Sequence, residues 1–122
     1  MKHYSGPGLD FFVGNIFHLA PDQLGPVQAV YDRAAMVALP EETRRKYTAH
    51  LVEISDEASQ LLITFQYDQN QMEGPPFSIS SQEIESHYGH VYEIQTLESR
   101  SVEGNLKGKV EATETIRLLS TI

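Results

Sequence analysis

The sequence predicts an α/β protein whose sheet is mostly parallel and closes in an antiparallel hairpin. Two apolar runs, Val27–Tyr31 and Leu61–Tyr67, have the length and composition of strands covered on both faces. Glu41–Ile54, between them, carries apolar residues at helical spacing, and strands that alternate with a helix favour a parallel arrangement. Only a polar segment separates the last two predicted strands, Val91–Leu97 and Thr113–Ser120, and this favours an antiparallel pair.

The N-terminal part of the sequence predicts a polar segment, a strand and two loops. Met1–Gly8 is polar and ends in Gly6-Pro7-Gly8, a turn signal. Leu9–Gly14 predicts a short strand of the same sheet, and Asn15–Leu19 its exit loop. Asp22–Pro26 is too short and too broken for a long helix, so we expect a second loop there.

The middle of the chain is dominated by the predicted helix. Ala34–Leu39 predicts a turn or short helix ahead of it. Pro40 suits the first turn of the long helix, with Glu41 and Glu42 near its positive end. The basic triplet Arg44–Lys46 is interpreted as part of a solvated helix face.

Three further segments complete the prediction. Asp68–Ile79 is a long loop after the third strand. Ser80–Glu83 has the S-x-x-E pattern of a capping box and opens a short helix that ends at Gly89. Glu98–Ala112 is either a mobile connector or the loop of a hairpin.

Composition limits the classes of function. A chain of 122 residues with 40% apolar and 21% charged residues predicts one globular domain over residues 1–122. The net charge of −8 argues against a nucleic acid or an anionic membrane as partner. The absence of cysteine excludes disulfides and thiolate chemistry, and the histidines lack metal-ligand spacing, so no metal is expected. Without an apolar span or targeting core, a cytoplasmic location is the default expectation.

Asp32 and Arg33 stand side by side between two apolar runs. We expect both to be buried, and burying an acid and a guanidinium costs free energy unless each is paired or binds a ligand. Open α/β sheets bind ligands at the carboxyl ends of their strands, where this pair lies. The pair is therefore either a ligand site or a structural ion pair at a strand end.

The loop after the third strand contains Gly74-Pro75-Pro76-Phe77. Two consecutive prolines stiffen the loop and present Phe77 at low entropic cost. A rigid apolar rim of this kind suits a flat aromatic substrate. The alternative is a rigid turn whose phenylalanine fills the core.

The motifs together carry a resemblance. Y-D-R-A-A-M-V-A-L-P, a helix, L-L-I-T-F-Q-Y-D-Q-N-Q-M-E-G-P-P-F-S-I and an acidic helix ending in Y-G follow one another. From about Leu9 to the C-terminus, this order resembles the thiopurine S-methyltransferase family. The resemblance implies the class I, Rossmann-like methyltransferase fold. It also implies methyl transfer from S-adenosylmethionine to the sulfur of aromatic or heterocyclic thiols, and to selenium and tellurium compounds in bacterial members.

The same resemblance assigns the cofactor contacts. Arg33 falls on an arginine at the cofactor and substrate site, and Asn15 and Ile16 fall on the pair that contacts the adenine. A guanidinium can hold a carboxylate or stabilise a thiolate-like acceptor more rigidly than lysine can. Methyl transfer between sulfur atoms depends on alignment more than on a protein base, so no catalytic base is assigned.

The acceptor pocket is implied in the same way. Pro75, Pro76 and Phe77 would form its rim. The basic residue that relatives carry near the final hairpin has no clear match, and Lys107 or Lys109 is the candidate to replace it.

Family members begin with about half a domain that this chain does not match. By resemblance, that half holds two strands, a glycine-bearing cofactor loop and the acid that binds the cofactor's ribose. In the class I order the two strands would lie between Leu9–Gly14 and Val27–Tyr31, leaving a gap of order 14 Å in the sheet. Exposed apolar edges would then promote self-association. We expect the chain alone to bind S-adenosylmethionine weakly or not at all.

Two alternatives stay open. The first is a non-catalytic, methyltransferase-like module that associates through open sheet edges. The second is an unrelated amino-methyltransferase, because P-P-F is similar to N-P-P-[YF]. In such enzymes the prolines would follow the second strand directly, whereas here they follow the third strand within a long loop.

Overall fold

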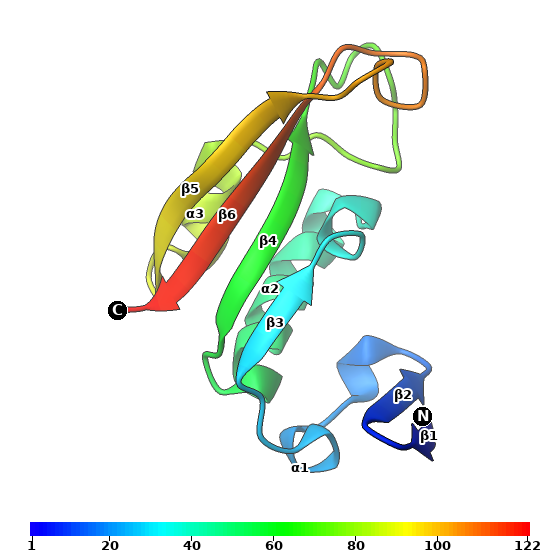
Figure 1. Cartoon of the computed structure of the whole chain (residues 1–122), viewed down its shortest axis with the longest axis vertical. Coiled ribbons are helices and arrows are strands. Elements are labelled where there is room, and N and C mark those ends of the chain that lie inside the picture. Colours follow the sequence, from blue (N-terminus) through cyan, green and yellow to red (C-terminus); the bar gives the residue numbers. More distant parts are fainter.

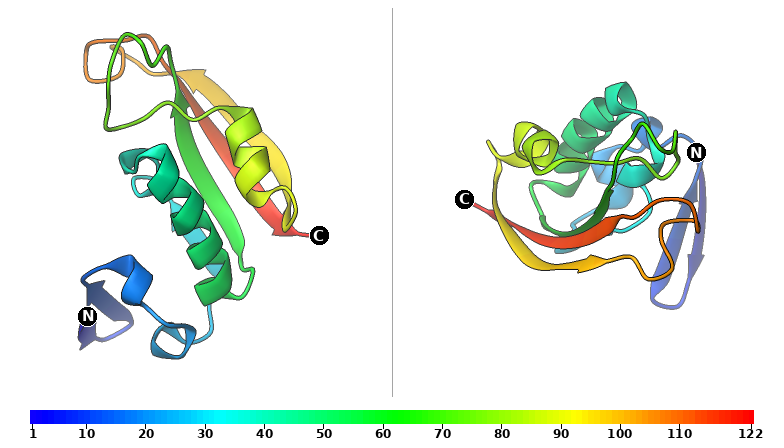
Figure 2. Two further views of the ribbon diagram at one scale, coloured as in Figure 1. Left: turned by 180° about the vertical axis from the view of Figure 1, so that it is seen from behind. Right: turned by 90° about the horizontal axis from the view of Figure 1, so that it is seen from above.

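A four-stranded sheet in the order β3-β4-β6-β5 forms the centre of the computed structural model, which describes all of residues 1–122. Two helices lie against the same face of this sheet (Figures 1 and 2). The strands are β3 (Ala29–Asp32), β4 (Ser59–Gln66), β5 (Tyr92–Ser101) and β6 (Thr113–Thr121), and the helices are α2 (Glu41–Ser55) and α3 (Ser81–Tyr88).

The sheet is mixed: β3, β4 and β5 run in one direction and β6 runs opposite to them, which agrees with the prediction of a mostly parallel sheet. Only β3 and β4 pair in parallel, while β4–β6 and β5–β6 are antiparallel. A parallel pair needs a crossover, and α2 supplies one between β3 and β4. The crossover through α3 does not produce a second parallel pair, because β6 lies between β4 and β5. The predicted C-terminal antiparallel hairpin is confirmed, with a register shift between Thr96 and Glu98.

The N-terminal strands form a separate hairpin. β1 (Lys2–Gly6) pairs with β2 (Leu9–Val13) across the predicted turn at Pro7-Gly8. The strand expected at Leu9–Gly14 therefore exists but does not join the main sheet, because the preceding polar segment is its partner. The predicted gap inside the sheet is absent, and β3 is instead an edge strand.

Helix α2 forms within one residue of its predicted end. Pro40 is its N-cap and not part of its first turn, and Glu41 and Glu42 lie near its positive end. It ends at Asp56, which adopts a left-handed conformation with φ 53°. The short helix expected before it is a 3₁₀ turn, η2 (Met36–Ala38).

Helix α3 begins at the predicted cap. The Ser80 hydroxyl accepts a hydrogen bond from the Glu83 backbone N–H at 3.1 Å, and the helix ends just before Gly89. The Glu83 carboxylate bonds to Arg44 and not back to the cap residue, so only one half of the capping box forms. The N-terminal segment contains one more short helix, α1 (Pro21–Leu24), and a 3₁₀ turn, η1 (Ile16–His18).

Most of the core lies between the sheet and the helices. It consists of twelve buried residues, Leu19, Met36, Val37, Tyr47, Leu51, Ile54, Leu62, Ile79, Ile84, Tyr88, Tyr92 and Leu119. A second cluster of Leu106, Val110 and Ala112 fills the loop between β5 and β6. Of Glu98–Ala112, predicted as a connector or a hairpin loop, the first four residues belong to β5 and residues 102–112 form a hairpin loop with its own small core. None of the helices has the length and apolar character needed to span a bilayer.

Candidate functional site

Two loops meet where β4 ends and the β5–β6 hairpin turns (Figure 1). One loop, residues 67–80, connects β4 to α3, and the other connects β5 to β6. Together they enclose a cavity of about 340 Å³. Its lining residues are Gln71, Met72, Glu73, Gly74, Pro75, Lys107 and Lys109. Of the predicted rim residues, Pro75 lines this cavity beside both lysines that were considered as the basic residue of the site, whereas Pro76 and Phe77 do not line it.

Hydrogen bonds order the loop after β4. The Gln69 side chain donates to the Met72 carbonyl at 2.7 Å and accepts from the Ser78 backbone N–H at 2.9 Å. The Tyr67 hydroxyl donates to the Pro76 carbonyl at 2.6 Å. The predicted stiffness of this loop therefore has a second source besides its prolines.

The side chain of Phe77 points from the loop after β4 toward Arg44 of α2. The backbone N–H of Phe77 donates to the Val37 carbonyl at 2.7 Å, and the Arg44 guanidinium lies 5.6 Å from the centroid of the Phe77 ring. The ring is half-buried and packs against neither hydrophobic cluster. Gly74 lies under the ring with φ +88°, and a Cβ there would be 2.8 Å from Phe77 Cδ1, so only glycine fits.

Arg44 joins the loop to both helices. Its Nε and Nη2 donate to the Glu83 carboxylate at 2.7 and 2.9 Å, and its Nη1 donates to the Leu39 carbonyl at 2.6 Å. His87 Nε2 lies 3.0 Å from the same carboxylate. Burial alone would raise the pKa of Glu83, but the hydrogen bonds from Arg44 and His87 outweigh it and lower the pKa.

Burial of Arg44 corrects the prediction that the basic triplet is a solvated face. Arg45 and Lys46 are exposed as predicted, but Arg44 is only 4% exposed. The signal was present in the sequence, because Arg44 precedes Tyr47 by three residues and Leu51 by seven. These spacings put all three on one helix face.

Asp32 and Arg33 point in different directions. Asp32 is buried and accepts hydrogen bonds from the Tyr47 hydroxyl at 2.8 Å and the Met36 N–H at 3.2 Å. Burial, together with the nearby Asp32 charge, raises the pKa of Tyr47. Arg33 is exposed and makes no ion pair, so the expected burial of Arg33 is wrong. Asp32 is the last residue of β3, and Arg33 follows it in a bend, where its side chain is exposed.

The predicted adenine contacts lie on a different part of the molecule. Asn15 Oδ1 accepts from the Phe17 N–H at 3.0 Å, and the Ile16 carbonyl lies 2.8 Å from His50 Nε2. His50 is six residues beyond Arg44 in α2, which is about 9 Å along the helix axis. Hence the Asn15–Ile16 turn and the Phe77 loop contact separate positions on α2.

Comparison with known proteins identifies the family. The thiopurine S-methyltransferase family model matches residues 1–119. The thiopurine S-methyltransferase of Xanthobacter autotrophicus is 51% identical over 116 residues, which are 95% of this chain and 54% of the relative. The Teredinibacter turnerae enzyme of that name is 47% identical over 119 residues, 98% of this chain and 56% of the relative. The chain thus spans about half the length of the curated relatives it matches, and nearly all of it is matched. It therefore belongs to the thiopurine S-methyltransferase family.

Proposed function

We propose that residues 1–122 form the C-terminal part of a class I, Rossmann-like methyltransferase domain. The first two strands of the family fold are not among these residues. The domain would transfer a methyl group from S-adenosylmethionine to the sulfur of an aromatic or heterocyclic thiol. The observation that carries this proposal is the cavity in which Gly74 and Pro75 face Lys107 and Lys109, in a chain of this family. A cytoplasmic location is part of the proposal.

Three residues suit the cofactor. When bound, S-adenosylmethionine supplies an electrophilic methyl group on a sulfonium sulfur. The exposed Arg33 guanidinium has no hydrogen-bond partner in the chain, so it is available to a carboxylate. Asn15 uses its side-chain oxygen in the turn but keeps its amide N–H groups for an adenine, and Ile16 offers an apolar contact.

The thiol would sit in the cavity between the two loops. Pro75 lines this cavity, Pro76 and Phe77 follow it in the same stiff loop as the proposed rim, and Lys107 and Lys109 would lower the cost of a thiolate. The thiol would lose its proton to water, and the two lysines and the loop would hold the resulting thiolate sulfur for alkylation. S-adenosylmethionine would supply the methyl group and keep the electron pair of its broken C–S bond, so that both products would be neutral thioethers at sulfur. Selenium and tellurium compounds, whose nucleophilic atoms are heavier homologues of sulfur, are proposed as further acceptors.

A chimera tests this proposal. The chain would replace the matching segment of the Xanthobacter relative, and methyl transfer to 6-mercaptopurine would be measured. We expect activity, and we expect Arg33→Met to raise the KM for S-adenosylmethionine about 10-fold or more, the cost of a lost charge-assisted hydrogen bond. Arg45→Met, an exposed change of equal charge, is the control and should leave KM unchanged. A folded chimera without activity, or an unchanged KM in Arg33→Met, would contradict the proposal.

The alternative is a non-catalytic module that associates through its open sheet edges. Strand β3 has no partner on its outer side, and Tyr31 on it is 63% exposed. A discrete dimer of the chain, together with a chimera that folds but transfers no methyl group, would favour this alternative.

A further inference from the structure

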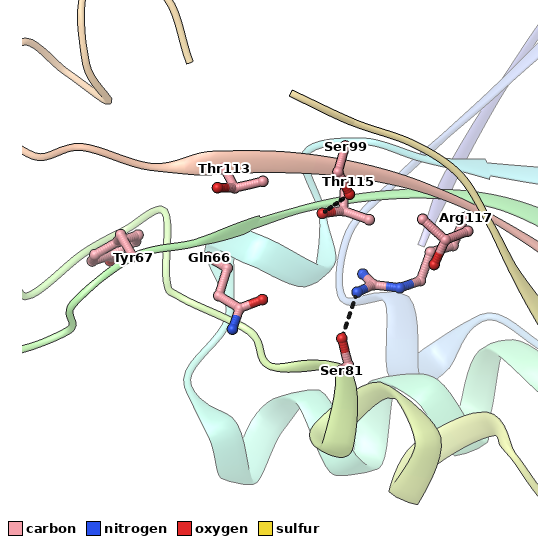
Figure 3. Close-up of a pocket in the computed structure, with 8 residues that line it drawn as sticks. Gln66, Tyr67, Ser81, Ser99, Thr113, Thr115 and Arg117 are labelled. Carbon is pink, nitrogen blue, oxygen red and sulfur yellow. Dashed lines mark hydrogen bonds between the residues drawn. The ribbon is translucent and has the colours of Figure 1, made fainter. Parts of the chain in front are cut away.

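Arg117, in the middle of β6, is a buried cation without a counter-charge. It is 5% exposed and faces α3 from the covered side of the sheet (Figure 3). Its Nη1 donates to the Thr64 hydroxyl at 3.0 Å and its Nη2 to the Ser81 hydroxyl at 2.9 Å. No carboxylate pairs with it, and burial alone lowers its pKa. Buried charges in proteins are normally paired, and no acidic side chain of the chain pairs with this one.

A cavity of about 490 Å³ opens beside this guanidinium. Apart from Arg117 itself its lining carries no charge, and hydroxyl groups predominate (Figure 3). The other lining residues are Gln66, Tyr67, Ser81, Thr96, Ser99, Thr113 and Thr115. A cation surrounded by neutral donors, with no acid in reach, attracts an anion.

The hydroxyl groups are arranged to donate. Because Ser81 accepts its hydrogen bond from Arg117, its own proton is left for a ligand. Ser99 and Thr115 share one hydrogen bond at 3.1 Å, so one of their two protons is also free. Ser81 is the first residue of α3, and the positive end of the helix dipole adds to the field at this point.

We propose that Arg117, Ser81 and the surrounding hydroxyl groups bind a small oxyanion, either inorganic phosphate or the carboxylate of a small organic acid. The cavity shares no lining residue with the one between Gly74–Pro75 and Lys107–Lys109. The proposal of an oxyanion site is therefore independent of the proposal of methyl transfer, and each can be tested separately.

Titration of the isotope-labelled 122-residue chain tests the site. Sodium phosphate and sodium benzoate would be added in separate experiments at constant ionic strength, and the amide signals of Ser81, Thr96 and Thr113 followed by NMR. We expect saturable shifts with at least one of the two anions, and the two titrations distinguish an inorganic from a carboxylate ligand. A concentration of 50 mM is about 10-fold above the dissociation constant of a weak site. The absence of any shift at 50 mM of either anion would therefore overturn the proposal.

Variants locate the binding. Arg117→Met should weaken binding about 20-fold or more, since hydrogen bonds to charged groups are worth roughly 10- to 100-fold in affinity. Arg100→Met is the matched control, because Arg100 is exposed and pairs with Glu114, and its affinity should stay within about twofold of the parent. Equal affinity in folded Arg117→Met would overturn the proposal.

A second variant decides the matter if Arg117→Met does not fold. Ser81→Ala changes an exposed residue and keeps the Arg117 charge, so it should fold and weaken binding about fivefold or more. If Ser81→Ala binds as tightly as the parent chain, the anion lies elsewhere and the proposal is wrong.

Discussion

Arg44 is the residue at which the two helices and the loop after β4 meet. It holds Glu83 with two hydrogen bonds and lies against the Phe77 ring. Removing one partner of a buried ion pair costs about 3–5 kcal/mol, because the other charge stays buried without compensation. We expect Arg44→Met to lower the free energy of unfolding by about 2–4 kcal/mol, the lower end reflecting the partial exposure of Glu83.

Arg45→Met is the control for that change. Arg45 is the next residue on the same helix and pairs with Glu42 on the exposed surface, where ion pairs contribute about 0–1 kcal/mol. Urea denaturation of both variants compares the two sites directly. Equal losses in the two variants would contradict the role assigned to Arg44.

The lowered pKa of Glu83 predicts a loss of stability in acid. A carboxyl group whose pKa is lower in the folded state contributes stability above its unfolded pKa, near 4.5, and loses it as the pH falls through the folded value. Urea denaturation from pH 7 to pH 3 should show this loss below about pH 4.5. Glu83→Gln removes the titrating group, so the variant should be less stable at pH 7 and less sensitive to acid. An unchanged slope would contradict the prediction.

The raised pKa of Tyr47 predicts the opposite dependence in base. A group whose pKa is higher in the folded state contributes stability below its unfolded pKa, near 10, and loses it as the pH rises further. Tyr47→Phe should flatten the decline in stability above pH 10. It should also cost about 1–3 kcal/mol at pH 7, because buried Asp32 loses a donor. Tyr31→Phe, on an exposed tyrosine, should change neither quantity.

The burial of residues in α2 was predictable from their helical spacing. The apolar residues whose helical spacing predicted α2 include Tyr47, Leu51 and Ile54, which are buried, and the same spacing includes Arg44. Its charge suggested solvent, but the helix position decided its burial. Arg33 shows the reverse case, because its apolar neighbours suggested burial, whereas it follows the end of β3 in a bend and is exposed.

At the scale of elements, the loop after β4 depends on one glycine. Gly74 combines φ +88° with a Phe77 ring carbon 2.8 Å from where a Cβ would stand. Gly104 has a similar φ of +73° but open space around it. Gly104→Ala should therefore cost only the backbone term of about 1–2 kcal/mol, and Gly74→Ala clearly more. Thermal unfolding of both variants measures the difference, and equal costs would show that the Phe77 ring moves aside freely.

Elements with local signals were predictable, and their pairing was not. Helix α2, the cap of α3 and the β5–β6 hairpin follow from spacing, a capping serine and a polar connection. The order of the strands depended on β6 inserting between β4 and β5, which is a long-range contact without a local signature. The β1–β2 hairpin was missed because Lys2–Gly6 is polar and exposed throughout, and so shows no apolar run.

At the scale of the whole molecule, the main sheet ends on one side in β5 and on the other in β3, whose outer edge has no partner. Tyr31 on this strand and Tyr4 on β1 are both exposed, at 63% and 55%. If β3 associates with a second copy, Tyr31→Lys should shift the chain toward monomer, because a charge at a strand edge opposes pairing. Tyr4→Lys adds the same charge elsewhere. Sedimentation at several concentrations compares the two, and equal behaviour would argue against association through β3.

The site was predictable in part at this scale. The motif G-P-P-F and the two lysines of the last loop could be named from the sequence, and the structure brings Gly74–Pro75 and both lysines to one cavity. The sequence could not show that the Asn15–Ile16 turn is anchored farther along α2. Nor could it indicate Arg117, whose partners come from β4 and α3, far away in the chain.

Calorimetric titration of S-adenosylmethionine tests the central claim most directly, with the 122-residue chain and the chimera measured side by side. We expect the chimera to bind the cofactor, and the chain alone to bind it weakly or not at all. Micromolar binding to a monomer of the chain alone, or no binding to a folded chimera, would contradict the claim that this chain forms one part of a methyltransferase site.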